Sequence, residues 1–312
     1  MILCVNLNAA IDKTIVVDHF ELGQIHRPKS VLSLAGGKGC NVARVLNTLG
    51  QPAAVTGWVG GYAGQFILAQ LRQEGVRDAF VTTAVESRTC TSVVDASTNV
   101  ITEIYESGVP VQPEEVEMLL ATVEGWLSKA QLLVLSGSLP PGAPRNIYAQ
   151  LIDRARTAGV PTVLDASKDA LQLGLLAQPT YVKPNQTELA EILQTPLDTV
   201  EQQRTAAQEV ARRHQTTVIL SLGKHGALLT DGELMWQAVP PPVHAISAVG
   251  SGDSLVAGFT SAVVSGSSLP DALRLGVACG TANTLMIGAG RLQRGDVDAI
   301  RPGVTVTQLE TS

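Results

Sequence analysis

The 312-residue sequence contains few cysteines and few charges, and each shortage excludes a class of protein. Cys4, Cys40, Cys90 and Cys279 show no C-x-x-C spacing, which excludes a disulfide framework and the common zinc motifs. The five histidines show no metal-ligand spacing either. Only 16% of residues are charged and the formal net charge is −6, so we expect neither nucleic acid nor an anionic membrane as a partner.

Long apolar runs and targeting signals are also missing. No segment approaches the roughly 20 predominantly apolar residues that cross a bilayer. The N-terminus has no basic region ahead of a long apolar stretch. A hydrophobic content of 45% nevertheless supports a globular protein with a sizeable core. We therefore expect a cytoplasmic protein.

Three widespread enzyme motifs are absent. The sequence has no G-x-x-x-x-G-K-[ST], no G-x-G-x-x-G with a trailing acid, and no G-x-S-x-G. These absences argue against a Walker-type nucleotide loop, an NAD-dependent Rossmann enzyme and an α/β-hydrolase.

From residue 113 onward, short apolar strands alternate with amphipathic helices. The strand-like segments are 132–137, 161–166, 180–185 and 217–223, and the helical ones lie around 116–127, 145–158, 186–194 and 200–213. This alternation predicts an α/β fold with a mostly parallel sheet covered by helices on both faces. Ligands of such sheets bind outside the carboxyl ends of the strands, which here carry polar residues.

The first hundred residues follow a different pattern. The segments 14–20, 29–35, 88–96 and 99–106 have strand character with little helix between them. They indicate a small β lobe built from two insertions, at about 12–35 and 88–107, into one domain spanning 1–312. Ordinary surface hairpins would give the same pattern.

The segment 247–259 carries the strongest chemical signal. Gly250, Ser251 and Gly252 precede Asp253, and an apolar helical stripe follows. Glycines before a helix let its free N–H groups approach an anion, which the helix dipole also favours. A carboxylate at that point could take a proton from a hydroxyl that attacks the anion. The alternative is that Asp253 simply caps the helix.

The segment 35–50 combines glycines with one lysine ahead of a predicted helix. Gly37 and Lys38 could cradle a phosphate or a sugar, or they could form a tight turn with an exposed lysine.

Two further segments also allow both a structural and a functional interpretation. Asn185 and Glu188 have the spacing of a helix capping box, but could also face a nucleotide phosphate and its hydrated Mg²⁺. The segment 221–229 could be an ordinary hairpin or a close approach to a ligand.

Together these segments resemble, in content and order, the ribokinase-like (PfkB) sugar kinases. The matching segments are NAAID (8–12), AGGKGCNVAR (35–44), Arg88, SGSLPPG (136–142), KPNQTEL (183–189), SLGKHGALL (221–229) and VGSGDSLVAGF (249–259). Within the family the sequence is most similar to the phosphosugar branch, which contains 1-phosphofructokinase, tagatose-6-phosphate kinase and the minor 6-phosphofructokinase.

The resemblance implies a three-layer α/β/α sandwich with a β-sheet lid that pairs with a second lid in a homodimer. It also implies ATP and Mg²⁺ as cofactors, and it assigns roles to individual residues. Asp253 would be the base, with Gly250, Ser251 and Gly252 forming the anion hole. Asp12, Gly37, Lys38 and Asn41 would hold the sugar, and Arg27 and Arg88, with Lys29 and Ser138, its phosphate. Lys183, Asn185, Glu188, Ser221, Gly223, Gly226 and Asn283 would line the ATP side, with Glu188 holding Mg²⁺ through water.

Some residues depart from the family pattern. Ser251 replaces an alanine in the anion hole, and Cys90 replaces an asparagine near the sugar. The expected reaction is ATP-dependent phosphorylation of fructose 1-phosphate to fructose 1,6-bisphosphate. Tagatose 6-phosphate and fructose 6-phosphate remain alternative substrates, and a non-catalytic sugar-phosphate sensor remains an alternative of a different class.

Overall fold

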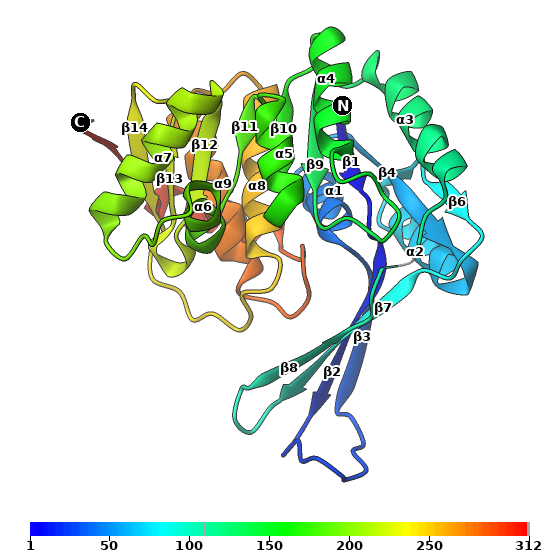
Figure 1. Cartoon of the computed structure of the whole chain (residues 1–312). Coiled ribbons are helices and arrows are strands. Elements are labelled where there is room, and N and C mark those ends of the chain that lie inside the picture. Colours follow the sequence, from blue (N-terminus) through cyan, green and yellow to red (C-terminus); the bar gives the residue numbers. More distant parts are fainter. Residues whose placement is uncertain (109, 311–312) are drawn as a thin grey trace.

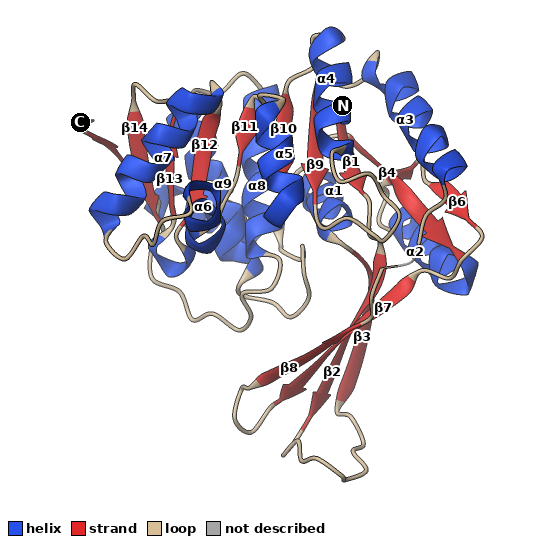
Figure 2. Cartoon of the chain, in the orientation of Figure 1, coloured by secondary structure: helices blue, strands red, loops and turns tan. Residues whose placement is uncertain are grey.

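A large central sheet forms the body of the protein (Figures 1 and 2), in a computed structural model that describes residues 1–108 and 110–310. In spatial order its strands are β15 (Thr305–Leu309), β14 (Met235–Val239), β13 (Ala227–Thr230), β12 (Thr217–Ser221), β11 (Tyr181–Val182), β10 (Thr162–Asp165), β9 (Leu132–Ser136), β1 (Ile2–Asn6), β4 (Ala53–Gly60) and β5 (Arg77–Asp78). β6 (Val81–Thr83) also pairs with β4. The strands from β5 to β12 run parallel, and β13, β14 and β15 extend the sheet in antiparallel fashion.

Helices cover both faces of this sheet (Figure 2). One layer contains α1 (Lys38–Thr48), α2 (Gly61–Gln73), α8 (Ser251–Val264), α9 (Leu269–Asn283) and α10 (Arg294–Ile300). The other contains α3 (Pro113–Leu127), α4 (Ile147–Thr157), α5 (Lys168–Leu176), α6 (Gln186–Leu193) and α7 (Val200–His214). Side chains alternate across β1: Ile2 and Cys4 enter one apolar core, whereas Leu3 and Val5 enter the other. The predicted three-layer α/β/α sandwich is therefore confirmed.

A second, four-stranded sheet projects from the body (Figure 1). Its strands are β3 (Ser30–Gly36), β2 (Ala10–Val17), β7 (Arg88–Asp95) and β8 (Ile101–Tyr105). We call it the small sheet. β2 and β7 pair in parallel at its centre, while β3 and β8 pair antiparallel at its edges. Every residue of β8 is exposed.

The register of the central sheet aligns the polar ends of three strands. Asn6 of β1 lies opposite Ser136 of β9, which in turn lies opposite Asp165 of β10. Helices α1 and α8 pack together beside this carboxyl edge. Two short 3₁₀ turns, η1 (Gly223–His225) and η2 (Arg301–Gly303), complete the described elements. In the part of the chain that the structure describes, no helix has both the length and the hydropathy needed to span a bilayer.

Candidate active site

The first turn of α8 places a carboxylate at the carboxyl edge of the central sheet. Gly250 precedes the helix with φ of 82°, and a Cβ at this position would lie 2.6 Å from the Cα of Ala289, so only glycine fits without strain. Asp253 follows within the first helical turn and is 6% exposed. The capping position is occupied by Gly250, not by Asp253. Simple capping therefore does not account for the aspartate.

The carboxylate of Asp253 is buried and is held by an amide. Nδ2 of Asn41, on α1, donates a 2.8 Å hydrogen bond to its Oδ2. Burial raises the pKa of Asp253 to about 6, and the nearby ammonium group of Lys38 only partly opposes this effect. Among the described residues, no cation lies within ion-pair distance of this carboxylate. Such a group can accept a proton near neutral pH.

Asp165, at the end of β10, holds two lysines with one oxygen. Its Oδ1 lies 3.0 Å from Nζ of Lys38 and 3.1 Å from Nζ of Lys183. Burial alone would raise the pKa of Asp165, but the charges of Lys183 and Lys38 outweigh burial and hold it below the usual range. Asp165 in turn raises the pKa of Lys38. Oδ2 of Asp165 has no hydrogen-bond partner among the described residues, so an acceptor remains free in the site.

A cavity of about 590 Å³ opens beside the start of α8. The predicted residues Ser221, Gly223, Gly226, Ser251 and Gly252 line it, together with the segment 240–243 and the inner side of α9. Its size is typical of small-molecule sites. A Cβ on Gly252 would lie 3.6 Å from Nζ of Lys183, so an ammonium group stands beside the free end of the helix.

A smaller cavity, of about 170 Å³, lies between the small sheet and two loops of the body. Asp12, Cys90 and Tyr105 line it from the small sheet, and the segments 246–249 and 287–289 line it from the body. Burial raises the pKa of Asp12 and also raises that of Cys90 to about 11, so the Cys90 side chain is a neutral thiol. A Cβ on Gly36 would lie 2.2 Å from the Asp12 carboxyl carbon, so this glycine is needed for close packing.

Arg88 lies at the foot of the small sheet, near Asp12. Its Nη1 and Nη2 donate to the carbonyl oxygens of Glu106 and Asn8, each at 3.2 Å. Its buried Nε has no partner among the described residues. Ser138 lies nearby, because its hydroxyl accepts a hydrogen bond from Asn8 at 3.1 Å. Arg88 therefore retains a donor for an additional ligand.

Other predicted site residues have structural contacts of their own. Asn185 and Glu188 form the capping box of α6, with two reciprocal 2.9 Å hydrogen bonds. Asn283 is fully buried, where it accepts from the hydroxyl of Ser254 at 2.8 Å and donates to the carbonyl of Val249 at 2.9 Å. Asn283 thus lies behind the turn at Gly250 and does not line the cavity of about 590 Å³.

Arg27 is separated from the other predicted residues. It is exposed in the loop joining β2 to β3, at the far end of the small sheet (Figure 1). Lys29, in the same loop, forms an exposed 2.6 Å ion pair with Asp18. Within one chain, the fold does not bring these two cations to the carboxyl edge.

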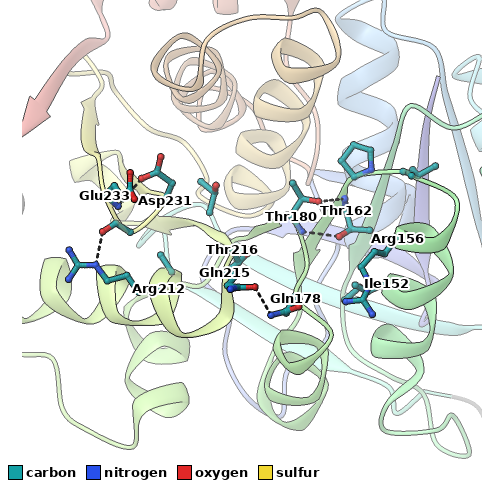
Figure 3. Close-up of a pocket in the computed structure, with 16 residues that line it drawn as sticks. Ile152, Arg156, Thr162, Gln178, Thr180, Arg212, Gln215, Thr216, Asp231 and Glu233 are labelled. Carbon is teal, nitrogen blue, oxygen red and sulfur yellow. Dashed lines mark hydrogen bonds between the residues drawn. The ribbon is translucent and has the colours of Figure 1, made fainter.

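A larger hollow, about 880 Å³, lies at the opposite, amino edge of the central sheet (Figure 3). Its arginines contact local groups: Nε of Arg212 donates to the carbonyl of Gly232, and Nη1 of Arg156 donates to that of Ala177. Gln178 and Gln215 join across it through their amides. The two carboxylates that line this open groove, Asp231 and Glu233, are exposed, whereas Asp253 beside the 590 Å³ cavity is buried, so we place the chemistry at the carboxyl edge.

Two residues of this site were not predicted. Asp165 was recognised only as a polar strand end, because nothing in the sequence links it to lysines 127 and 18 residues away. Arg44 lies three residues after Asn41, so the predicted helix places both on one face. No sequence pattern shows that the arginine is buried. The described residues contain no group of three or more His, Cys, Asp or Glu side chains suited to a metal.

Comparison with known proteins agrees with this geometry. Residues 5–293 match the model of the pfkB family of carbohydrate kinases. The chain is similar to the tetrameric inhibited form of phosphofructokinase-2 from Escherichia coli, at 32% identity over 96% of this chain and 98% of that chain, with a TM-score of 0.90. It is also similar to a possible 1-phosphofructokinase from Thermotoga maritima, at 25% identity over 99% and 100% of the two chains, with a TM-score of 0.87.

A ribokinase from Arabidopsis thaliana, at 22% identity over 96% and 98% of the two chains and a TM-score of 0.76, shares the fold. These matches confirm the predicted ribokinase-like fold and the prediction of an ATP-dependent sugar kinase. The chain belongs to the pfkB family of carbohydrate kinases.

Proposed function

We propose that this kinase phosphorylates a ketohexose phosphate, with fructose 1-phosphate as the preferred substrate and Asp253 as the general base. The observation that carries the proposal is the position of Asp253: a buried carboxylate without an ion-pair partner among the described residues, beside the free N–H groups of α8 and a cavity of nucleotide size. Its pKa of about 6 keeps the carboxylate ionised at neutral pH, but basic enough to take a proton.

In this mechanism Asp253 removes the proton from the attacking sugar hydroxyl. The hydroxyl oxygen forms a bond to the γ-phosphorus of ATP as the bond to the bridging oxygen of ADP breaks. Gly250 and Gly252 present main-chain N–H groups to the transferred phosphoryl group, whereas the N–H of Ser251 donates to the carbonyl of Ala248 at 3.2 Å. Lys183 adds a positive charge beside Gly252. Lys38 and Lys183 are held in place by Asp165, so they need little reorganisation during the reaction.

The residues present also fit a hydrated Mg²⁺ ion. Such an ion usually binds one or two carboxylates together with substrate phosphates, and Glu188 and the free Oδ2 of Asp165 supply oxygen acceptors of this kind. When bound, the ion would neutralise charge that develops on the phosphate oxygens.

The phosphate already on the sugar would bind Arg88, whose free Nε and planar fork suit an anion. Asp12, which lines the smaller cavity, would hold the sugar hydroxyls together with Asn41. Ser221, Gly223 and Gly226, which line the 590 Å³ cavity, would face ATP together with the α6 cap Asn185. We also propose that the small sheet closes over the sugar as a lid and pairs with a second copy. Exposed Val31, Ile104 and Tyr105 favour such pairing, and Arg27 could then act in the partner's site. A monomeric mass in sedimentation at assay concentrations would contradict the pairing.

The decisive experiment compares substrates under steady-state conditions. We expect kcat/KM to be highest for fructose 1-phosphate, lower for tagatose 6-phosphate and fructose 6-phosphate, and lowest for unphosphorylated sugars. A preference for either 6-phosphate would replace the named substrate but keep the role of Arg88. A preference for an unphosphorylated sugar would overturn that role.

A further inference from the structure

Arg44 is a buried arginine on α1, three residues after Asn41 and 6% exposed. Its Nε pairs with Oε2 of Glu74 at 2.8 Å, and its Nη2 donates to the carbonyl of Ala35 at 2.5 Å. Its Nη1 donates to Oδ1 of Asn41 at 3.0 Å and to the carbonyl of Ala289 at 3.1 Å. A buried guanidinium is costly unless it is well paired, and the pair with Glu74 uses only Nε. The two Nη groups face the surroundings of the active site.

The contact with Asn41 decides which end of its amide faces Asp253. A side-chain amide has one oxygen that accepts and one NH₂ that donates, whereas a guanidinium only donates. The oxygen of Asn41 must therefore face Arg44, which leaves the NH₂ to donate to Oδ2 of Asp253 at 2.8 Å. An ionised carboxylate only accepts, so this orientation suits the ionised form. With the amide flipped, two oxygens would oppose each other.

We propose that Arg44 is a positioning residue of the kinase reaction: it fixes the amide of Asn41 so that Asp253 is held in place in its ionised form. This inference rests on the proposed function, in which Asp253 is the base. Arg44 does not touch the substrates and acts only through Asn41.

The other contacts of Arg44 join the segments that surround the base. Ala35 lies at the foot of the small sheet, and Ala289 lies beside Gly250, where the anion-binding turn begins. The next residue, Gly290, packs so closely on α1 that a Cβ there would lie 2.8 Å from the Cα of Asn41. One guanidinium thus links the small sheet, the loop behind Gly250 and the partner of the base.

The charged and polar groups that face Asp253 come from three elements. Lys38 and Asn41 belong to α1, Asp165 ends β10, and Lys183 follows β11. All four side chains remain in a variant of Arg44. Any change in the titration of Asp253 would therefore report on the orientation of Asn41 and on the charge removed with Arg44.

The test is the pH profile of kcat/KM for Arg44→Met. In the unmodified enzyme we expect kcat/KM to fall as pH drops through about 6, because the base must be ionised. Loss of the Asn41 hydrogen bond raises the pKa of the base, so the activity of the variant should begin to fall about one pH unit higher. At pH 6 this shift lowers kcat/KM about fivefold, and the difference approaches about tenfold at still lower pH. A purely structural arginine would lower activity equally at every pH. An unshifted profile in a folded variant would overturn the proposal.

The matched control is Arg72→Met, which breaks an exposed pair with Asp78 and should leave the profile unchanged. A double-mutant cycle then tests the route through Asn41. In an Asn41→Ala background, Arg44→Met should add almost no further shift. Shifts that add fully would show that Arg44 acts by its charge alone and would overturn the positioning role.

A measurement on the unmodified protein covers the case in which Arg44→Met does not fold. A guanidinium held by four acceptors rotates slowly, so ¹⁵N-edited NMR should show separate, slowly exchanging Nη–H signals for Arg44. A single averaged signal would overturn the proposal. Asp253→Asn separates the proposed base from the proposed role of Arg44. If Asp253→Asn keeps normal kcat, the proposed base is wrong. If Asp253→Asn is inactive but the pH profile of Arg44→Met is unshifted, only the role of Arg44 is refuted.

Discussion

The two edges of the central sheet differ in how deeply their charged side chains are buried. At the carboxyl edge Asp165 is fully buried and Lys183 is 5% exposed, beside a cavity of about 590 Å³. At the amino edge the hollow is larger, about 880 Å³ (Figure 3), but the nearby pair of Arg156 and Asp153 is more than half exposed. Burying charge is costly, whereas exposed pairs contribute little to stability. Buried charge therefore favours the carboxyl edge as the site of chemistry, although the hollow at the amino edge is larger.

Removing the base should give the largest difference between the edges. Asp253→Asn keeps the size of the side chain and its contact with Asn41 but cannot accept a proton, so we expect kcat to fall by about 10²–10⁴ while sugar-phosphate binding persists. Asp153→Asn, at the amino edge, should leave kcat unchanged. Steady-state kinetics and equilibrium binding measure both effects. Nearly normal kcat in Asp253→Asn would remove the carboxyl edge from the chemistry.

The second comparison concerns stability. Asp165→Asn leaves the buried ammonium of Lys183 without its counter-ion, so we expect a loss of about 3 kcal/mol in the free energy of unfolding. Lys38 should contribute less, since its side chain is 37% exposed. In Asp153→Asn the loss should stay below about 1 kcal/mol. Urea denaturation of both variants measures the difference, and equal losses would contradict the comparison.

The smallest expected effect extends the comparison to the small sheet. Arg88→Ala removes a half-buried guanidinium with a free Nε, so KM for the sugar phosphate should rise by roughly 10- to 100-fold while KM for ATP stays nearly constant. Initial-rate measurements with each substrate varied in turn separate the two constants. If both KM values rose together, Arg88 would hold the foot of the small sheet rather than a ligand.

The repeating parts of the fold could be predicted from the sequence. The alternation after residue 113 predicted the parallel strands and helices in order, and the segments 14–20, 29–35, 88–96 and 99–106 predicted the small sheet. β1 and β4 were not predicted, because both are buried along their whole length and lack the alternation that indicates a strand. β9 is equally buried, but a clear helical stripe precedes it and marks its place in the alternation. Such strands are identified by their pairing with neighbouring strands, which becomes visible only in the folded structure.

The site could be predicted only where its residues are close in sequence. Gly250 to Asp253 form one turn, so their juxtaposition follows from local geometry alone. The contacts of Asn41 with Asp253 and of Lys38 with Asp165 span 212 and 127 residues, and they depend on how α1 packs on the sheet edge. Arg27 shows the opposite case, since the family resemblance assigned it to the sugar phosphate but its loop lies at the far end of the small sheet.

The sharing of Asp165 by two lysines has a consequence for how substrates arrive. With Asp253 ionised, the charges of the two ammonium groups and the two carboxylates cancel, so these four groups give the site no local excess of positive charge. The protein around it has a formal net charge of −6. ATP and a sugar phosphate are therefore captured by short-range contacts, not drawn in by a long-range field. Their encounter rates should consequently gain little from lowering the ionic strength.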